Sequence, residues 1–131
     1  MPNEGELDLL VKNPKYNSQE KKAERLLELG VKNVVVTQGA RGATLYTANG
    51  ERRYESVKVE VIDTTAAGDA FAGSLAFGLQ QDWDEDRIMN YCNLVAAITV
   101  TKLGAQRSLP ERAIVEKFIK RVSNYEKKRS Y

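Results

Sequence analysis

The chain contains no histidine, and this absence restricts its chemistry more than any other feature of its 131 residues. Catalysis by a serine–histidine pair and histidine-ligated zinc are both excluded. The single cysteine, Cys92, can form neither an internal disulfide nor a thiolate cluster, and we assign it, like Trp83, to packing. Any proton transfer must therefore use a carboxylate, a lysine, a tyrosine or that one thiol.

A long apolar run and an excess of one charge are also missing. No stretch is apolar enough to span a bilayer and no signal-peptide pattern is present, so we expect a cytoplasmic protein without a membrane partner. The 20 basic and 18 acidic residues leave a formal net charge of +2, which gives no reason to expect nucleic acid as a partner. The length and the 42% hydrophobic content fit one ordinary domain, residues 1–131.

The first half of the chain is predicted to hold a helix followed by strands. Asn17 has the chemistry of a helix cap, and Gly30 is a natural helix terminator. Residues 34–36 form a β-branched run that is typical of a strand buried on both faces. Residues 43–47 and 51–55 flank an Asn-Gly turn signal, so they are expected to form a hairpin.

The second half is predicted to be mainly helical. An extended segment at 57–61 precedes a helix of small apolar residues at 66–79. Asp82 has the position of a cap for a further helix that Gly104 would end, and Ser108 could cap the last one. This order indicates an α/β fold, and the low strand count suggests that the sheet is incomplete.

The segment from Asp63 to Gly73 ends an extended stretch and begins a helix. A start composed of Ala66, Ala67 and Gly68 leaves the unpaired N–H groups of a helix open to an approaching anion, with Asp69 at the rim. A structural alternative stays open, in which Thr65 caps the helix and Asp69 is an ordinary first-turn acid.

This segment, read as Asp-Thr-Thr-Ala-Ala-Gly-Asp, resembles the second signature of the ribokinase-like (PfkB) carbohydrate kinases, usually written D-T-x-G-A-G-D. Ala66 stands where most of the family has glycine, and it favours the ribokinase branch. Three further segments are similar to family motifs in the same order: residues 3–6 to N-x-x-E, 37–42 to T-x-G-x-x-G, and 104–110 to G-A-Q-x-S-x-P. The resemblance implies the C-terminal part of a three-layer α/β/α fold, without the N-terminal sugar-binding half and lid.

The resemblance also implies a role for each matched residue. Asp69 would be the base that takes the proton from the sugar hydroxyl, and the N–H groups of residues 66–69 would form the anion hole. ATP would contact Asn3, Thr37, Gly39, Arg41, Gly42, Gly68 and Asn93. Without the family, a helix cap explains Asn3 equally well, and a glycine hairpin turn explains Gly39 and Gly42.

Two cations are implied as well. Glu6 would act on Mg²⁺ through water, although a first-turn acid on a short helix is an equal alternative from the residues alone. A monovalent-cation loop for K⁺ would use Asp63, Thr65, Thr99, Lys102, Gly104 and Ser108. The K⁺ ion would fix the anion hole without joining the chemistry.

The implied reaction is the ATP-dependent phosphorylation of a small sugar, ribose giving ribose 5-phosphate. Two alternatives stay open: a non-catalytic nucleotide-binding fragment, and a related kinase for fructose, adenosine or a sugar acid. The chain alone is expected to be inactive. A cut through a parallel sheet would expose the strand at 34–37, so we expect self-association or pairing with the missing N-terminal half.

Overall fold

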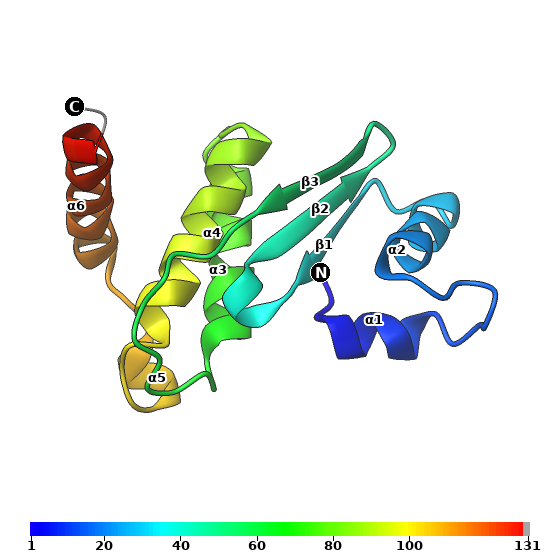
Figure 1. Cartoon of the computed structure of the whole chain (residues 1–131), viewed down its shortest axis with the longest axis horizontal. Coiled ribbons are helices and arrows are strands. Elements are labelled where there is room, and N and C mark those ends of the chain that lie inside the picture. The colour runs from blue at the N-terminus through cyan, green and yellow to red at the C-terminus, as the bar shows by residue number, and fades with distance from the viewer. Residues whose placement is uncertain (130–131) are drawn as a thin grey trace.

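The structure is a computed structural model that describes the backbone of residues 1–129 and the side chains of residues 1–105 and 108–120. Helices precede and follow a single hairpin-connected sheet (Figure 1). In chain order the elements are α1 (Glu4–Leu10), α2 (Gln19–Glu28), β1 (Asn33–Thr37), the short 3-10 helix η1 (Gly39–Arg41), β2 (Ala43–Thr47), β3 (Gly50–Tyr54), α3 (Ala67–Gln80), α4 (Glu85–Thr99), α5 (Ala105–Ser108) and α6 (Arg112–Arg129).

The sheet has the order β1-β2-β3, and both pairings are antiparallel. The bounds of β2 match the prediction, and the Asn-Gly signal does form the turn between β2 and β3. In the described residues β1 pairs with β2 and makes one parallel bridge, between Asn3 and Thr37, so the expectation that a parallel sheet is cut at this strand stays a prediction. The extended segment at 57–61 joins no strand of the described chain.

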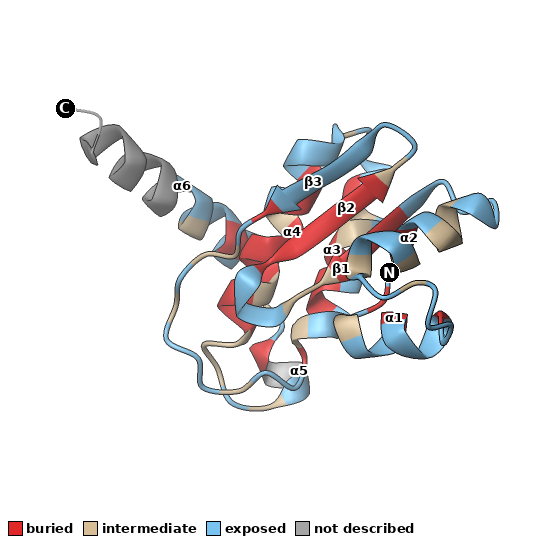
Figure 2. Cartoon of the chain, turned by 45° about the vertical axis from the view of Figure 1, so that its right-hand side comes forward, coloured by how far each residue is buried: buried red, intermediate tan, exposed pale blue. Residues whose placement is uncertain are grey.

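Helices cover both faces of this sheet, which confirms the three-layer α/β/α arrangement (Figures 1 and 2). Side chains alternate across a strand, so Val34 and Val36 face one layer and Val35 faces the other. On the first face Leu7 of α1 and Ala23 of α2 complete the core. On the second face the core residues are Ala43, Leu45, Tyr54, Phe71, Ile88, Met89 and Cys92.

Two predicted helix caps are displaced. Ser18, not Asn17, has the extended backbone of the α2 cap, and its hydroxyl accepts a hydrogen bond from the N–H of Lys21 at 3.2 Å. Asp84, not Asp82, caps α4 by accepting from the N–H of Arg87 at 2.8 Å. Asp82 has φ 53°, a left-handed conformation that a helix cap does not adopt.

The C-terminal helices differ from the prediction in two respects. Helix α4 ends at Thr99, and Gly104, which was expected to end it, lies directly before the short helix α5 with φ 90°. Ser108 does not cap α6: it ends the short helix α5, and its hydroxyl donates to the carbonyl of Ala105 at 2.8 Å. Val115 of α6 packs with Ala70, Leu94, Val95 and Ile98, and so joins α3, α4 and α6. Among the described residues, none of the helices combines the length and the apolar character that crossing a membrane requires.

Candidate functional site

Helix α3 begins without a capping side chain. Ala66 occupies the cap position, and no side chain hydrogen-bonds the first turn. Thr65, the residue that the structural alternative made the cap, instead donates its hydroxyl to Asp63 at 2.5 Å. Helices α1, α2 and α4 each have a side-chain cap, whereas Thr65 does not cap α3, so that part of the structural alternative is wrong. Its other part is confirmed, since Asp69 does lie in the first turn of α3.

The backbone N–H groups at this helix start are largely unused. Ala67 donates to the carbonyl of Thr64 at 3.2 Å, and the intrahelical series begins with Ala70, which donates to Ala66 at 2.9 Å. Within the described residues, no hydrogen bond uses the N–H groups of Ala66, Gly68 or Asp69. A Cβ built on Gly68 would meet nothing within 4 Å, so the space before the helix is open. The Asp69 side chain is exposed beside that space.

Asp63 joins this helix start to the loop after α4. Its carboxylate accepts from the hydroxyl and the N–H of Thr65, the latter at 2.9 Å, and from the N–H of Gly104 at 3.0 Å. These hydrogen bonds, first those from Thr65 and then that from Gly104, lower the pKa of Asp63 from its ordinary value. Asp63, Thr65 and Gly104, all predicted from the sequence as cation-loop residues, therefore lie together.

The other predicted cation-loop residues are held by local contacts. The N–H of Lys102 donates to the carbonyl of Thr99 at 3.3 Å, and the Thr99 hydroxyl donates to the carbonyl of Val95 at 2.8 Å. Ser108 is buried and donates within α5. The side chains of Gln106 and Arg107, from the same predicted segment, lie outside the described residues.

Asn3 and Glu6 form a reciprocal capping box at the start of α1. The Asn3 side chain accepts from the N–H of Glu6 at 2.9 Å, and Oε2 of Glu6 accepts from the N–H of Asn3 at 2.8 Å. The structural explanation of both residues is therefore confirmed, and it leaves Oε1 of Glu6 without a partner in the described chain. Beside this box, the N–H of Thr37 donates to the carbonyl of Pro2 at 3.1 Å.

The turn between β1 and β2 holds Gly39, Arg41 and Gly42. Gly42 has φ 94°, and a Cβ there would overlap the backbone of Tyr54, so only glycine fits. Nη2 of Arg41 lies 2.6 Å from each carboxylate oxygen of Glu4 in α1. Glu4 has no role among the residues predicted from the sequence, although its place inside the N-x-x-E pattern is a signal that could have identified it.

Asn93 lies in the middle of α4 and is only 3% exposed. Its Nδ2 donates to the carbonyl of Tyr54 at 2.8 Å and to that of Glu55 at 3.3 Å. Within the described residues its Oδ1 accepts no hydrogen bond. Since no buried side-chain oxygen or nitrogen of these residues lacks a partner, this Oδ1 is accessible to solvent. Asn93 borders a cavity of about 750 Å³ that Val57 and Tyr91 also line.

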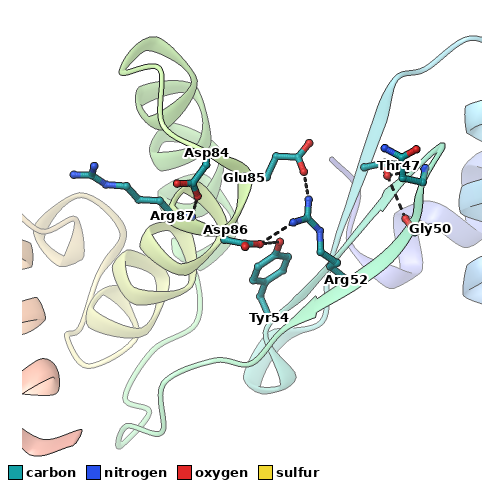
Figure 3. Close-up of polar contacts among 9 residues, drawn as sticks. Thr47, Gly50, Arg52, Tyr54, Asp84, Glu85, Asp86 and Arg87 are labelled. Carbon is teal, nitrogen blue, oxygen red and sulfur yellow. Dashed lines mark hydrogen bonds and ion pairs between the residues drawn. The ribbon is translucent and has the colours of Figure 1, made fainter. Parts of the chain in front are cut away.

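Strand β3 is also tied to the start of α4 (Figure 3). The Tyr54 hydroxyl donates to Asp86 at 2.6 Å, and Arg52 pairs with Asp86 at 3.0 Å and with Glu85. Burial, and then the hydrogen bond to Asp86, raise the pKa of Tyr54 to about 12. Together with Asn93, this network fixes the end of β3 along α4.

No second reactive centre is evident in the described chain. Cys92 is fully buried, and burial raises the pKa of its thiol to about 12, which confirms its assignment to packing. The residues described in the structure include no cluster of three or more cysteine or acidic side chains able to hold a metal ion.

Comparisons with known proteins agree with this arrangement. Residues 1–112 match the family model for pfkB family carbohydrate kinase. Ribokinase from Staphylococcus aureus is 39% identical over 114 residues, and deoxyribokinase from Salmonella typhi is 37% identical over 112 residues; each match covers 84% of this chain and 37% of the relative. The structure of a Ribokinase II from E. coli in complex with ATP and Mg²⁺ has a TM-score of 0.84 and 37% identity, over 92% of this chain and 38% of that one.

Proposed function

Because the chain belongs to the pfkB family of carbohydrate kinases, we propose that it supplies the nucleotide-binding and phosphoryl-transfer residues of an ATP-dependent sugar kinase, with ribose as the expected acceptor. The observation that carries this proposal is the start of α3, where unused N–H groups face open space beside the exposed Asp69. A helix start of this kind binds an anion through its N–H groups and the positive end of its dipole.

In the proposed reaction, Asp69 removes the proton from the acceptor hydroxyl. The hydroxyl oxygen then attacks the γ-phosphorus of ATP, the bond from that phosphorus to the β,γ-bridging oxygen breaks, and ADP leaves. The N–H groups of Gly68 and Asp69 stabilise the negative charge on the transferring phosphoryl group. A positioned base contributes about 10²- to 10⁴-fold, and each preorganised donor about 3 kcal/mol.

The nucleotide is proposed to lie between the β1–β2 turn and α4. Thr37, Gly39, Arg41 and Gly42 would follow its phosphates, with Asn3 nearby. The free Oδ1 of Asn93 is suited to accept a hydrogen bond from the exocyclic amine of adenine, and the adjoining cavity offers space for the base. The presence of ATP in the similar E. coli structure supports ATP as the nucleotide.

Mg²⁺ fits the donor set at the start of α1. The ion usually binds one or two carboxylates and keeps several waters, and Oε1 of Glu6 is the unpartnered carboxylate oxygen there. Bound Mg²⁺ would supply charge neutralisation for the phosphates. Glu6 would hold its hydration shell in place.

K⁺ fits the other side of the site. Asp63 supplies a carboxylate held ionised by its hydrogen bonds, next to the glycine loop at Gly104. The carbonyls of Thr65, Thr99, Lys102 and Gly104, together with Ser108, are the proposed remaining ligands. In this assignment K⁺ affects the reaction by holding Asp63 and Thr65, which lie just before the start of α3 in the chain.

A second candidate is a nucleotide-binding chain without transferase activity. It is favoured by the coverage, since the chain spans 37% of the length of the ribokinase and of the deoxyribokinase that it matches. The deoxyribokinase also keeps a sugar other than ribose open as the substrate. Either candidate keeps the same anion site.

Calorimetric titration of MgATP into the chain, with and without K⁺, tests the anion site. Gly68→Val should abolish binding, because its side chain would occupy space proposed for the phosphate, where an added Cβ meets no protein atom within 4 Å. Gly73→Val is the matched control: it lies on the same helix, and its Cβ also meets nothing within 4 Å. If both variants bind as the wild type does, the anion site is wrong.

A chimera separates the two candidates. Residues 1–112 would replace the matching region of Staphylococcus aureus ribokinase, and ribose-dependent ADP formation would be measured. We expect turnover that Asp69→Asn lowers by about 10²-fold or more while MgATP binding is kept. A chimera that binds MgATP and ribose without turnover would favour the non-catalytic candidate.

A further inference from the structure

Glu4 of α1 makes a long-range contact with the turn between β1 and β2. Nη2 of Arg41 lies 2.6 Å from both of its carboxylate oxygens, although the two residues are 37 positions apart. Glu4 lies in the first turn of α1 and Arg41 ends η1, so the pair joins two separate elements. These are the elements proposed above to hold Mg²⁺ and the nucleotide phosphates.

The pair is poorly suited to stabilising the fold. The Glu4 side chain is 45% exposed and that of Arg41 is 68% exposed. Exposed ion pairs contribute little to the stability of a fold, because water screens the charges and two long side chains lose freedom. The start of α1 is already held without Glu4, by the capping box of Asn3 and Glu6.

The geometry of Arg41 suits an oriented phosphate ligand. Only its Nη2 contacts Glu4, and within the described residues no hydrogen bond uses its Nε or Nη1. A guanidinium is a rigid planar fork, so fixing one nitrogen fixes the direction of the others. Glu4 therefore orients the group while leaving donors for an incoming ligand.

From these observations we propose that Glu4 is a positioning residue, which holds the Arg41 guanidinium in the direction that the phosphates of ATP require. The proposal rests on the proposed function, since it deepens the role of the same site. It predicts an effect opposite to that of charge alone. Removing a carboxylate near a triphosphate reduces repulsion and should by itself tighten ATP binding, whereas losing the orientation of Arg41 weakens it.

Glu4→Gln tests the proposal against a matched control. Asp8→Asn also removes one carboxylate and one ion pair from α1, but its partner is Lys22 of α2, at 2.6 Å, and not the turn. We expect Glu4→Gln to weaken MgATP binding about two- to fivefold in calorimetry, the range of an exposed ion pair. Asp8→Asn should leave the affinity unchanged or slightly higher.

A double-mutant cycle shows whether Glu4 acts through Arg41. In an Arg41→Gln background, Glu4→Gln should cause no further loss, because there is no guanidinium left to orient. Additive losses would mean that Glu4 acts independently of Arg41, and would overturn the proposal. Equal affinities of Glu4→Gln, Asp8→Asn and the wild type would also overturn it, while leaving the proposed function intact.

Amide hydrogen exchange at residues 39–42 separates positioning from a purely structural role. Faster exchange in Glu4→Gln with unchanged MgATP affinity would show that the pair only stabilises the turn, which contradicts positioning. If the wild-type chain binds no MgATP at all, the proposed function fails and this proposal fails with it.

Discussion

The carboxylate of Asp63 accepts a hydrogen bond from the N–H of Gly104 at 3.0 Å, across 41 residues of sequence. The same carboxylate holds Thr65, which directly precedes the cap position of α3. A side chain between two helices thus sets the loop after α4 and the start of α3 in one arrangement.

This contact should depend on pH. Its hydrogen bonds lower the pKa of Asp63 below the ordinary value of 3.8. A group with a lowered folded-state pKa stabilises the fold fully above its unfolded value, and the contribution is lost as the pH falls through the lower folded value. We expect the chemical shift of the Gly104 amide in NMR to change with pH, with a midpoint below pH 3.8. In Asp63→Asn this change should be absent. A midpoint at or above 3.8 would contradict the contact.

The turn glycines should differ in their tolerance of alanine. Gly42→Ala places a methyl group against the Tyr54 backbone at φ 94°, so we expect a loss of about 3 kcal/mol or more in the free energy of unfolding. Gly39→Ala also has positive φ, but its Cβ would meet nothing within 4 Å, and about 1 kcal/mol is expected. Urea denaturation measures both. Similar losses in the two variants would show that the overlap is absent.

Asn93→Ala should destabilise the chain whether or not a nucleotide is present. The substitution leaves the carbonyls of Tyr54 and Glu55 without their donor, at a cost of about 1–3 kcal/mol in the free energy of unfolding. Asn90→Ala is a suitable control, because Asn90 borders the same cavity but is exposed, and a change within about 0.5 kcal/mol is expected. A neutral Asn93→Ala would show that its amide does not anchor β3.

The outer edge of β1 should drive association. Gln38 donates to Gly42, so the antiparallel alternation pairs Val34 and Val36 with β2 and turns the backbone groups of Asn33 and Val35 outward. Such an unpaired edge accepts another strand, either from a second copy or from a chain that completes the sheet. We expect light scattering to detect self-association that Asn33→Pro reduces, since this proline removes an outward N–H. A wild-type monomer at all concentrations would contradict this.

Regular elements with strong local signals could be predicted from the sequence. The burial of residues 34–36 follows from their β-branched run, and the bounds of β2 follow from the glycine turns on either side of it. The caps of α2 and α4 could not be placed, because Asn17 and Ser18 have equal cap chemistry and only the backbone angles select one. Helix α1 could be predicted only as an alternative, from the cap chemistry of Asn3 and the first-turn position of Glu6.

The parts of the site that could be predicted are those formed by residues adjacent in sequence. The uncapped start of α3 follows from the small residues at 66–68, and this signal was sufficient to identify it. The contacts of Asp63 with Gly104 and of Glu4 with Arg41 join distant segments, and no local pattern encodes their distance. Asn93 was identified by resemblance alone, and its bonds to β3 became evident only in the structure.

The order of strands in the sheet is the order of strands in the chain, and this has a consequence for how the protein folds. Each strand pairs with its neighbour in sequence, so the sheet assembles through short loops with a small entropic cost of closure. A low contact order of this kind favours fast folding. The slower step should be the docking of α4 against β3, because the Tyr54 contacts to Asp86 and Asn93 close loops of 32 and 39 residues.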